Sequence, residues 1–327
     1  SAASDVYKRQ LYMCIYSGGR KHMEKNEKDY EKKMIVIKVM GGLGNQLFQL
    51  AFGMGIAKKY KYKVKYDITY YDNIPENDTK RELCIKNYLN LENIATKEEI
   101  ESYQCYHTNK IYRVLRKLHI QKEKVQYERL ENGISDLSQV SDDRYLIGFW
   151  QSERYVSTVR DEIVEMLQNV PTTLDNQVRE MIQKVQTCES VSIHVRAGDY
   201  LTGENEKIFG GICTSEYYKK CYALAKQVKP QSKFYLFTND VEWTKEHIDL
   251  PYSNIEIVSN QIRNENPWGE LMIMNRCHIN IIANSSYSWW AAWLNRNSDK
   301  IVYCPTKWTN NDSKLNEGIL CSSWIRV

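Results

Sequence analysis

The sequence has no long hydrophobic run. No stretch of its 327 residues approaches the roughly 18 to 20 consecutive apolar residues of a membrane-spanning helix. The apolar patch at residues 11–16 is too short for a signal peptide, although Lys8 and Arg9 precede it. We therefore expect a cytoplasmic protein without a transmembrane segment, and we leave peripheral attachment to the inner membrane open.

Paired cysteine motifs are also missing. Nine cysteines are scattered from Cys14 to Cys321, with no C-x-x-C pair and no Cys/His cluster at zinc-site spacing. This distribution is typical of a reducing compartment. Six prolines are too few for a long disordered linker. The formal net charge of +4 is spread over mixed-sign stretches, so it favours an anionic ligand only weakly and does not indicate a nucleic-acid partner.

The length of the chain indicates two domains, because 327 residues are more than one hydrophobic core usually serves. Residues 1–33 are polar and aperiodic, and we interpret them as a disordered or artefactual N-terminal extension. We expect the first domain at residues 34–170 and the second at residues 171–327.

Apolar runs and helical patterns alternate along the chain. Strands are predicted at residues 34–40, 64–68, 190–195, 233–237, 255–258, 279–283 and 301–304. Helices are predicted from a cap at Asn45, at 112–124, from Ser152 to Leu167, at 174–185, after Thr214, at 270–277 and from Ser285 or Ser286. The alternation predicts an α/β fold with parallel sheets, in which ligands bind at the carboxyl ends of the strands.

A glycine-rich loop, GGLGNQ, lies between the first predicted strand and helix and contains Gly41, Gly42, Gly44, Asn45 and Gln46. Backbone amides in such a loop can hold anionic or polar ligand atoms. The simpler interpretation is a tight turn with a capping asparagine. The loop is neither a Walker motif nor a G-x-G-x-x-G motif.

Polar residues follow the strand at Ser190–Val195, in the run HVRAGDY. Alternation along the strand places His194 and Arg196 on the same face, so both could address one ligand, and Gly198 allows the turn. The structural alternative is an ion pair between Arg196 and Asp199.

A second polar strand end is Phe237-Thr238-Asn239-Asp240, where Asp240 could accept hydrogen bonds from the N1 and N2 donors of guanine. Helix capping by Asn239 or Asp240 is the alternative. A third is the run NSSYS with Asn284, Ser285, Ser286 and Ser288, where hydroxyls and helix amides would seat a phosphate. We expect the three tryptophans that follow, Trp289, Trp290 and Trp293, to belong to the core.

Taken in order, the motifs GGLGNQLFQLAFG, GFWQSERYV, HVRAGDY, FTND, NSSYSWWAAWL and CPTKW resemble the α-1,2-fucosyltransferases of glycosyltransferase family eleven, over residues 34–327. The resemblance implies a GT-B architecture, with two Rossmann-like domains facing a cleft, the first on the acceptor side and the second binding GDP-fucose. It also implies GDP-β-L-fucose as the donor, inversion at the anomeric carbon, a galactose-terminated acceptor and no metal or other cofactor.

The resemblance further implies roles for individual residues. Arg196 should hold the pyrophosphate, His194 and Asp240 should lie at the nucleoside, and the segment from Ser285 to Ser288 should seat a phosphate. The glycine-rich loop should face the reacting sugar. The family usually has HVRRGDY where this chain has Ala197, which puts a second guanidinium contact in doubt, or an ion pair that steadies the loop.

The sequence predicts that sugar transfer needs no metal ion. The chain contains no Asp-x-Asp motif, so Arg196 and the helix terminus at Ser286 would have to neutralise the departing GDP. For the base that deprotonates the acceptor, Asp199 is the nearest acid. Glu204 lies ten residues beyond His194, the spacing at which the similar core α-1,6-fucosyltransferases carry a catalytic glutamate. A loose oxocarbenium-like transition state needs little base assistance.

Two alternatives remain open from the sequence. One is fucose transfer to another acceptor, such as a chitooligosaccharide, an N-glycan core or a protein hydroxyl. The other is a nucleotide-sugar-binding protein without catalysis, which would bind GDP tightly and turn over no donor.

Overall fold

The computed structural model describes residues 34–76, 79–108, 124–128, 143–167, 170, 174–259, 266–311 and 318–327, without the side chains of residues 105–108 and 204. The expected N-terminal extension and almost all of the helix expected at residues 112–124 lie outside the described residues. The described residues form two parallel sheets, one from each half of the chain.

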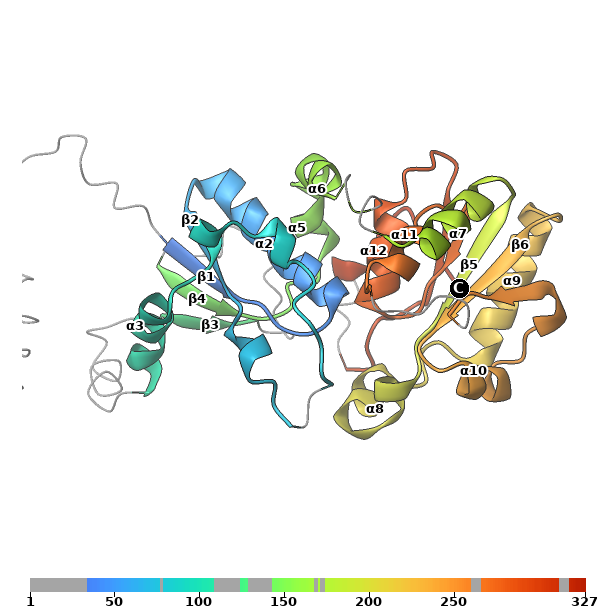
Figure 1. Cartoon of the computed structure of the whole chain (residues 1–327). Helices are drawn as coiled ribbons and strands as arrows, with labels where there is room; N and C mark the ends of the chain where they lie inside the picture. Colours follow the sequence, from blue (N-terminus) through green and yellow to red (C-terminus); the bar gives the residue numbers. More distant parts are fainter. Residues whose placement is uncertain are drawn as a thin grey trace, which may run out of the picture. The chain divides into compact units, whose positions relative to one another are not determined.

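The first sheet contains β1 (Met34–Lys38), β2 (Lys63–Asp67), β3 (Val125–Tyr127) and β4 (Arg144–Ile147), in the order β2-β1-β4-β3. Side chains alternate between the faces of a strand, so β1 contributes to two separate cores. Ile35 and Ile37 pack with α2 (Leu43–Tyr60), while Val36 packs on the other face with Tyr103 of α3 (Lys97–Thr108) (Figure 1).

The second sheet has the order β10-β9-β8-β5-β6-β7 and is parallel throughout. Its strands are β5 (Ser190–Val195), β6 (Lys233–Thr238), β7 (Ile255–Ile257), β8 (Ile279–Ile281), β9 (Ile301–Cys304) and β10 (Ile325–Arg326). Counted along the chain, this is the 3-2-1-4-5-6 order of a Rossmann fold, and strand order reverses between β5 and β8. The carboxyl ends of these two strands therefore flank the expected ligand crevice.

Helices cover both faces of the second sheet (Figure 1). One face packs on α9 (Ser215–Val228), and the other packs on α7 (Asn176–Gln186), α11 (Gly269–Met274) and α12 (Ser286–Leu294). Three short helices, α5 (Glu153–Ser157), α6 (Arg160–Met166) and α8 (Gly203–Phe209), lie in connecting segments, and α10 (Val241–His247) follows β6. No helix in these described ranges is both long and apolar enough to cross a bilayer.

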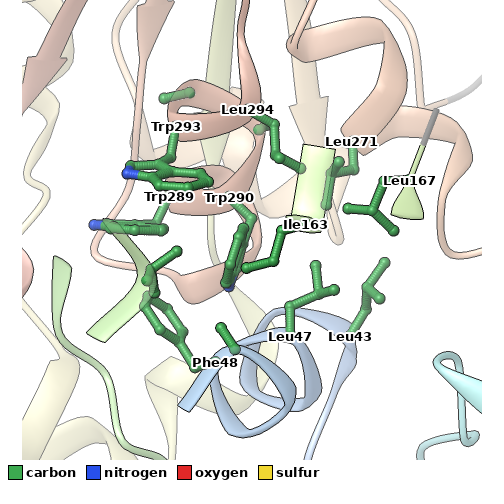
Figure 2. Close-up of a cluster of buried hydrophobic side chains, with 14 of the residues drawn as sticks. Leu43, Leu47, Phe48, Ile163, Leu167, Leu271, Trp289, Trp290, Trp293 and Leu294 are labelled. Carbon is green, nitrogen blue, oxygen red and sulfur yellow. The ribbon is translucent and has the colours of Figure 1, made fainter. Parts of the chain in front are cut away.

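One hydrophobic cluster joins helices from both halves of the chain. Figure 2 shows Leu43, Leu47 and Phe48 of α2 facing the tryptophans of α12. The Phe48 ring centroid lies 4.6 Å from that of Trp289 and 5.1 Å from that of Trp290. The expectation that Trp289, Trp290 and Trp293 form core is confirmed, because their exposed fractions are 0%, 0% and 4%.

The expected α/β fold with two parallel sheets is confirmed, and the second sheet has the expected Rossmann strand order. Several local predictions were wrong. Gly42, not Asn45, is the N-cap of α2, because the chain already turns at Gly41 with φ +81°. The helix expected from Ser152 to Leu167 is broken into α5 and α6. The cleft between domains and the boundary at residues 170 and 171 stay predictions.

Candidate functional site

Two of the predicted polar motifs follow β5 and β8, the strands that flank the reversal of strand order. Arg196 comes directly after β5, and Ser285 is the N-cap of α12 shortly after β8. Parallel neighbours end at the same edge of a sheet, so both motifs lie at the crevice where Rossmann folds bind ligands. The fold thus gives Arg196 and the start of α12 the position that the sequence predicted.

Arg196 pairs with Asp199, as the structural alternative predicted. Its Nη2 donates to Asp199 Oδ2 over 2.8 Å, and its guanidinium lies 5.4 Å from the ring centroid of Tyr200. The Nε of Arg196 is nevertheless buried without a hydrogen-bond partner among the described residues. The ion pair therefore leaves part of the donor capacity of Arg196 unused.

A second arginine, Arg81, reaches the same carboxylate from the other half of the chain. Its Nη2 lies 3.3 Å from Asp199 Oδ2. Burial and the nearby charge of Arg196 lower the pKa of Arg81. Arg81 could not be predicted from the sequence, since it lies in a charged segment without clear periodicity. Ala197, where the resemblance expects arginine, is fully buried, and the second guanidinium near Asp199 belongs to Arg81.

Asn239 connects the loops after β5 and β6. Its Oδ1 accepts a 2.9 Å hydrogen bond from the backbone N–H of Ala197. Gly198 has φ +63°, and a Cβ there would lie 2.6 Å from Asn239 Nδ2. This position therefore requires glycine. Asp240 caps α10, since its Oδ1 accepts from the Trp243 N–H over 3.0 Å, so the capping alternative is confirmed while the guanine contact stays a prediction.

His194 is buried on β5 near Arg196. Only 4% of its surface is exposed, and its Nδ1 has no hydrogen-bond partner within the described part of the chain. Burial, with a contribution from the charge of Arg196, lowers the pKa of His194 to about 3. The imidazole is therefore neutral at physiological pH and would interact with a ligand as a neutral group.

Gln46 organises the glycine-rich loop from within. It is fully buried, and its Nε2 donates to the carbonyls of Gly41 and Glu82 over 2.9 and 2.8 Å. Its Oε1 accepts from the N–H groups of Cys84 and Ile85 over 2.8 and 3.3 Å. In this structure Gln46 holds two loops together and has no hydrogen-bonding capacity left for a ligand.

The glycine-rich loop contacts the first turn of α12. Asn45 Oδ1 accepts hydrogen bonds from Gln151 Nε2 over 2.7 Å and from Ser286 Oγ over 2.8 Å. A Cβ at Gly44 would lie 2.5 Å from the backbone carbon of Ser286. Two motifs predicted separately, the loop and the phosphate seat, therefore meet directly. Gln151 was not among the predicted site residues.

Other predicted site residues have structural contacts here. Asn284 is buried, and its Nδ2 donates to the carbonyls of Phe209 and Trp308 over 3.0 and 3.1 Å. Ser288 is fully buried and donates to the carbonyls of Ala283 and Ser285, just before α12. Ser285 is buried without a side-chain cap hydrogen bond. Glu204 lies in α8, and its side chain is outside the described residues.

A further group of residues, not among the predicted site residues, lies at the carboxyl ends of β3 and β4. Glu128 Oε2 accepts from the N–H groups of Phe149 and Trp150 over 2.7 and 3.0 Å, and burial raises the pKa of Glu128. The Phe149 side chain is 39% exposed, and its ring would lie 3.4 Å from a Cβ at Gly41. An exposed aromatic ring therefore stands beside the glycine-rich loop.

Comparisons with known proteins agree with the sequence motifs. The model of glycosyl transferase family 11 matches residues 34–327. The O-antigen biosynthesis glycosyltransferase WbnK of Escherichia coli is 32% identical over 306 residues, which cover 88% of this chain and 98% of WbnK. An alpha-1,2-colitosyltransferase of Escherichia coli is 28% identical over 303 residues, 90% of this chain and 99% of that enzyme. Human galactoside alpha-(1,2)-fucosyltransferase 1 matches over 104 residues, 32% of this chain and 28% of the human protein, with 26% identity.

Proposed function

The chain belongs to glycosyl transferase family 11, and from that premise we propose that it transfers L-fucose from GDP-β-L-fucose to the 2-hydroxyl of a terminal β-galactoside. The anomeric carbon inverts, and no metal ion takes part. The observation that carries the proposal is that Arg196 follows β5 and the start of α12 follows β8, the two strands between which strand order reverses.

The charges of this site suit a departing nucleoside diphosphate. Cleavage of the sugar–phosphate bond places extra negative charge on GDP. The guanidinium of Arg196 and the positive end of the helix dipole of α12 would stabilise that charge. A fixed guanidinium can also donate two parallel hydrogen bonds to phosphate oxygens, which a lysine ammonium cannot.

The stereochemistry follows from the direction of attack. An acceptor hydroxyl that approaches the anomeric carbon opposite the leaving GDP converts a β-linked donor into an α-linked product. The relatives support an α-1,2 linkage, because the colitosyltransferase and the human enzyme both carry that linkage in their names. The human enzyme, named as a galactoside transferase, supports the galactoside acceptor.

Product analysis tests the proposal. The full chain is incubated with GDP-fucose and a panel of β-galactosides, and the purified product is examined by NMR. We expect Fucα1,2Gal, and we expect Arg196→Ala to lower kcat/KM by about 100-fold or more while the protein stays folded. A β-fucoside would contradict inversion, and a 3-, 4- or 6-linked fucose would contradict the acceptor assignment. Near-normal activity of Arg196→Ala would contradict the role of Arg196.

A second donor is favoured by one specific comparison. The colitosyltransferase aligns with 90% of this chain, a coverage as complete as that of any relative described above. GDP-colitose is therefore the alternative sugar donor for the same site. Competition between GDP-fucose and GDP-colitose for one acceptor decides between them, because the preferred donor has the higher kcat/KM.

A further inference from the structure

We propose that Arg81 is a second cation for the diphosphate of the nucleotide sugar, acting together with Arg196, and that Asp199 positions both guanidinium groups. This inference rests on the proposed GDP-sugar donor. It assigns a ligand contact to a residue from the N-terminal half of the chain, and it gives Asp199 a role other than that of a base.

The charges around Asp199 do not balance. One carboxylate faces two guanidinium groups. Asp199 Oδ2 lies 3.3 Å from Arg81 Nη2, and Asp199 Oδ1 lies 2.7 Å from Arg196 Nη2. Among the residues that the structure describes, Asp199 is the acid that pairs with either arginine. Repulsion from Arg196 also contributes to the lowered pKa of Arg81. The group therefore carries a net positive charge that an anionic ligand would stabilise.

The two arginines can donate further hydrogen bonds. The Arg196 Nε is buried without a partner within the described ranges, and Arg81 uses only one terminal nitrogen on Asp199. The side chain of Arg81 is 34% exposed and that of Arg196 is 18% exposed, so a ligand can reach both. Two guanidinium groups that share one anchor suit a ligand with two adjacent phosphates.

Arg81 is held in place by the segment that follows it. The buried carboxamide of Gln46 binds the carbonyl of Glu82 and the N–H of Cys84, each over 2.8 Å. The side chain of Arg81 also lies along the glycine-rich loop, since its Cδ and Nε would be 3.8 Å from a Cβ at Gly42. A cation fixed before the ligand arrives loses little entropy on binding, which increases its contribution.

The same geometry changes the interpretation of Asp199. Its Oδ2 accepts hydrogen bonds from Arg81 over 3.3 Å and from Arg196 over 2.8 Å. The lone pairs of this oxygen are therefore directed at the two guanidinium groups and not at a sugar hydroxyl. Asp199 therefore acts on the reaction through the two arginines that it positions.

Binding measurements without turnover test the inference. Isothermal titration with GDP and with guanosine compares the full-length wild type, Arg81→Gln and the control Lys80→Gln. Lys80 is the exposed neighbour of Arg81, so the control makes the same change in net charge. Loss of a charge-assisted hydrogen bond predicts that Arg81→Gln weakens GDP binding by about 10-fold or more. Guanosine lacks the diphosphate, so its affinity should match that of the wild type.

Two outcomes with Arg81→Gln would overturn the inference. GDP affinity of Arg81→Gln equal to that of Lys80→Gln would remove Arg81 from the diphosphate site. An equal loss for guanosine and GDP would assign Arg81 a structural role. If Arg81→Gln does not fold, Arg81→Lys replaces it. Lysine keeps the charge but not the planar fork, so we expect Arg81→Lys to bind GDP more weakly than wild type and guanosine equally well. Unchanged GDP affinity of Arg81→Lys would overturn the inference.

A double-mutant cycle tests the positioning role of Asp199. In the Asp199→Asn background, Arg81→Gln should cost less GDP affinity than in the wild type, because Arg81 is no longer positioned. Additive losses would contradict a shared role. A wild-type protein that binds no GDP would instead reject the proposed donor, so failure of the proposed function is distinguishable from failure of this inference.

Discussion

Gly44→Ala tests the contact between the glycine-rich loop and α12. Gly44 lies in the first turn of α2, and an added Cβ would be 2.5 Å from the backbone carbon and 2.6 Å from the Oγ of Ser286. Carbon atoms normally pack about 3.5–4.0 Å apart. The first turn of one helix must therefore move by about 1 Å to accept a methyl group at this position.

One stabilising effect and two destabilising effects give the magnitude. Alanine is better than glycine in a helix by about 1 kcal/mol. Overpacking of a close contact costs about 1–3 kcal/mol. The shift would also strain the 2.9 Å hydrogen bond from Trp290 Nε1 to the Gly44 carbonyl, a bond of a type that contributes about 1 kcal/mol. We expect a net loss of about 1–3 kcal/mol in the free energy of unfolding.

Urea unfolding of wild type and Gly44→Ala measures this loss. The midpoint should fall while the slope with denaturant stays the same, because the folded state remains compact. Thermal unfolding should show a lower Tm. Helix propensity alone predicts the opposite sign, so a Gly44→Ala variant more stable than wild type would refute the close approach of Gly44 to Ser286.

Three further predictions concern the site. Burial lowers the pKa of His194 in the folded protein to about 3, from its ordinary value of 6.5. The unfolded state therefore binds more protons between these pH values, and stability should fall with decreasing pH. When the pH falls from 6.5 to 5, the unfolding free energy of wild type should therefore decrease by about 2 kcal/mol more than that of His194→Phe. An equal decrease in both proteins would contradict burial of a neutral imidazole. Asp240→Asn should weaken GDP binding and relax discrimination against ADP; unchanged GDP affinity would leave Asp240 with its capping role alone. Transfer should persist in excess EDTA, since Arg196 can supply the positive charge, and complete loss restored only by Mg²⁺ or Mn²⁺ would contradict metal independence.

The sequence predicted the central strands well because burial leaves a clear pattern. The strand at Ser190–Val195 is buried along its whole length, and its bounds agree with the prediction. By contrast, β3 and β4 are three and four residues long and begin or end in polar or exposed residues. Helix α3 has acidic residues in its first turn and little apolar periodicity. Such elements are stabilised by tertiary packing, which local patterns do not record.

The site was predictable where its residues follow apolar strands. Arg196 and Ser286 could be placed because carboxyl strand ends bind ligands in parallel sheets. Arg81 could not, because it is 118 positions from Asp199 in the chain and its local sequence resembles that of any charged loop. Asn45 was misplaced as a cap because asparagine favours that position, whereas the turn at Gly41 starts the helix earlier.

The hydrophobic cluster between α2 and α12 limits how the two halves of the chain can be separated or exchanged with those of other proteins. Expressed alone, residues 171–327 would expose the indoles of Trp289 and Trp290, which now pack on Phe48. Large apolar surfaces of this kind promote aggregation. A chimera that takes its N-terminal half from another member of the family would need an α2 helix whose apolar side chains fit these tryptophans. Loops outside this cluster can therefore be exchanged without disturbing it, whereas an exchange of whole halves must match both of its sides.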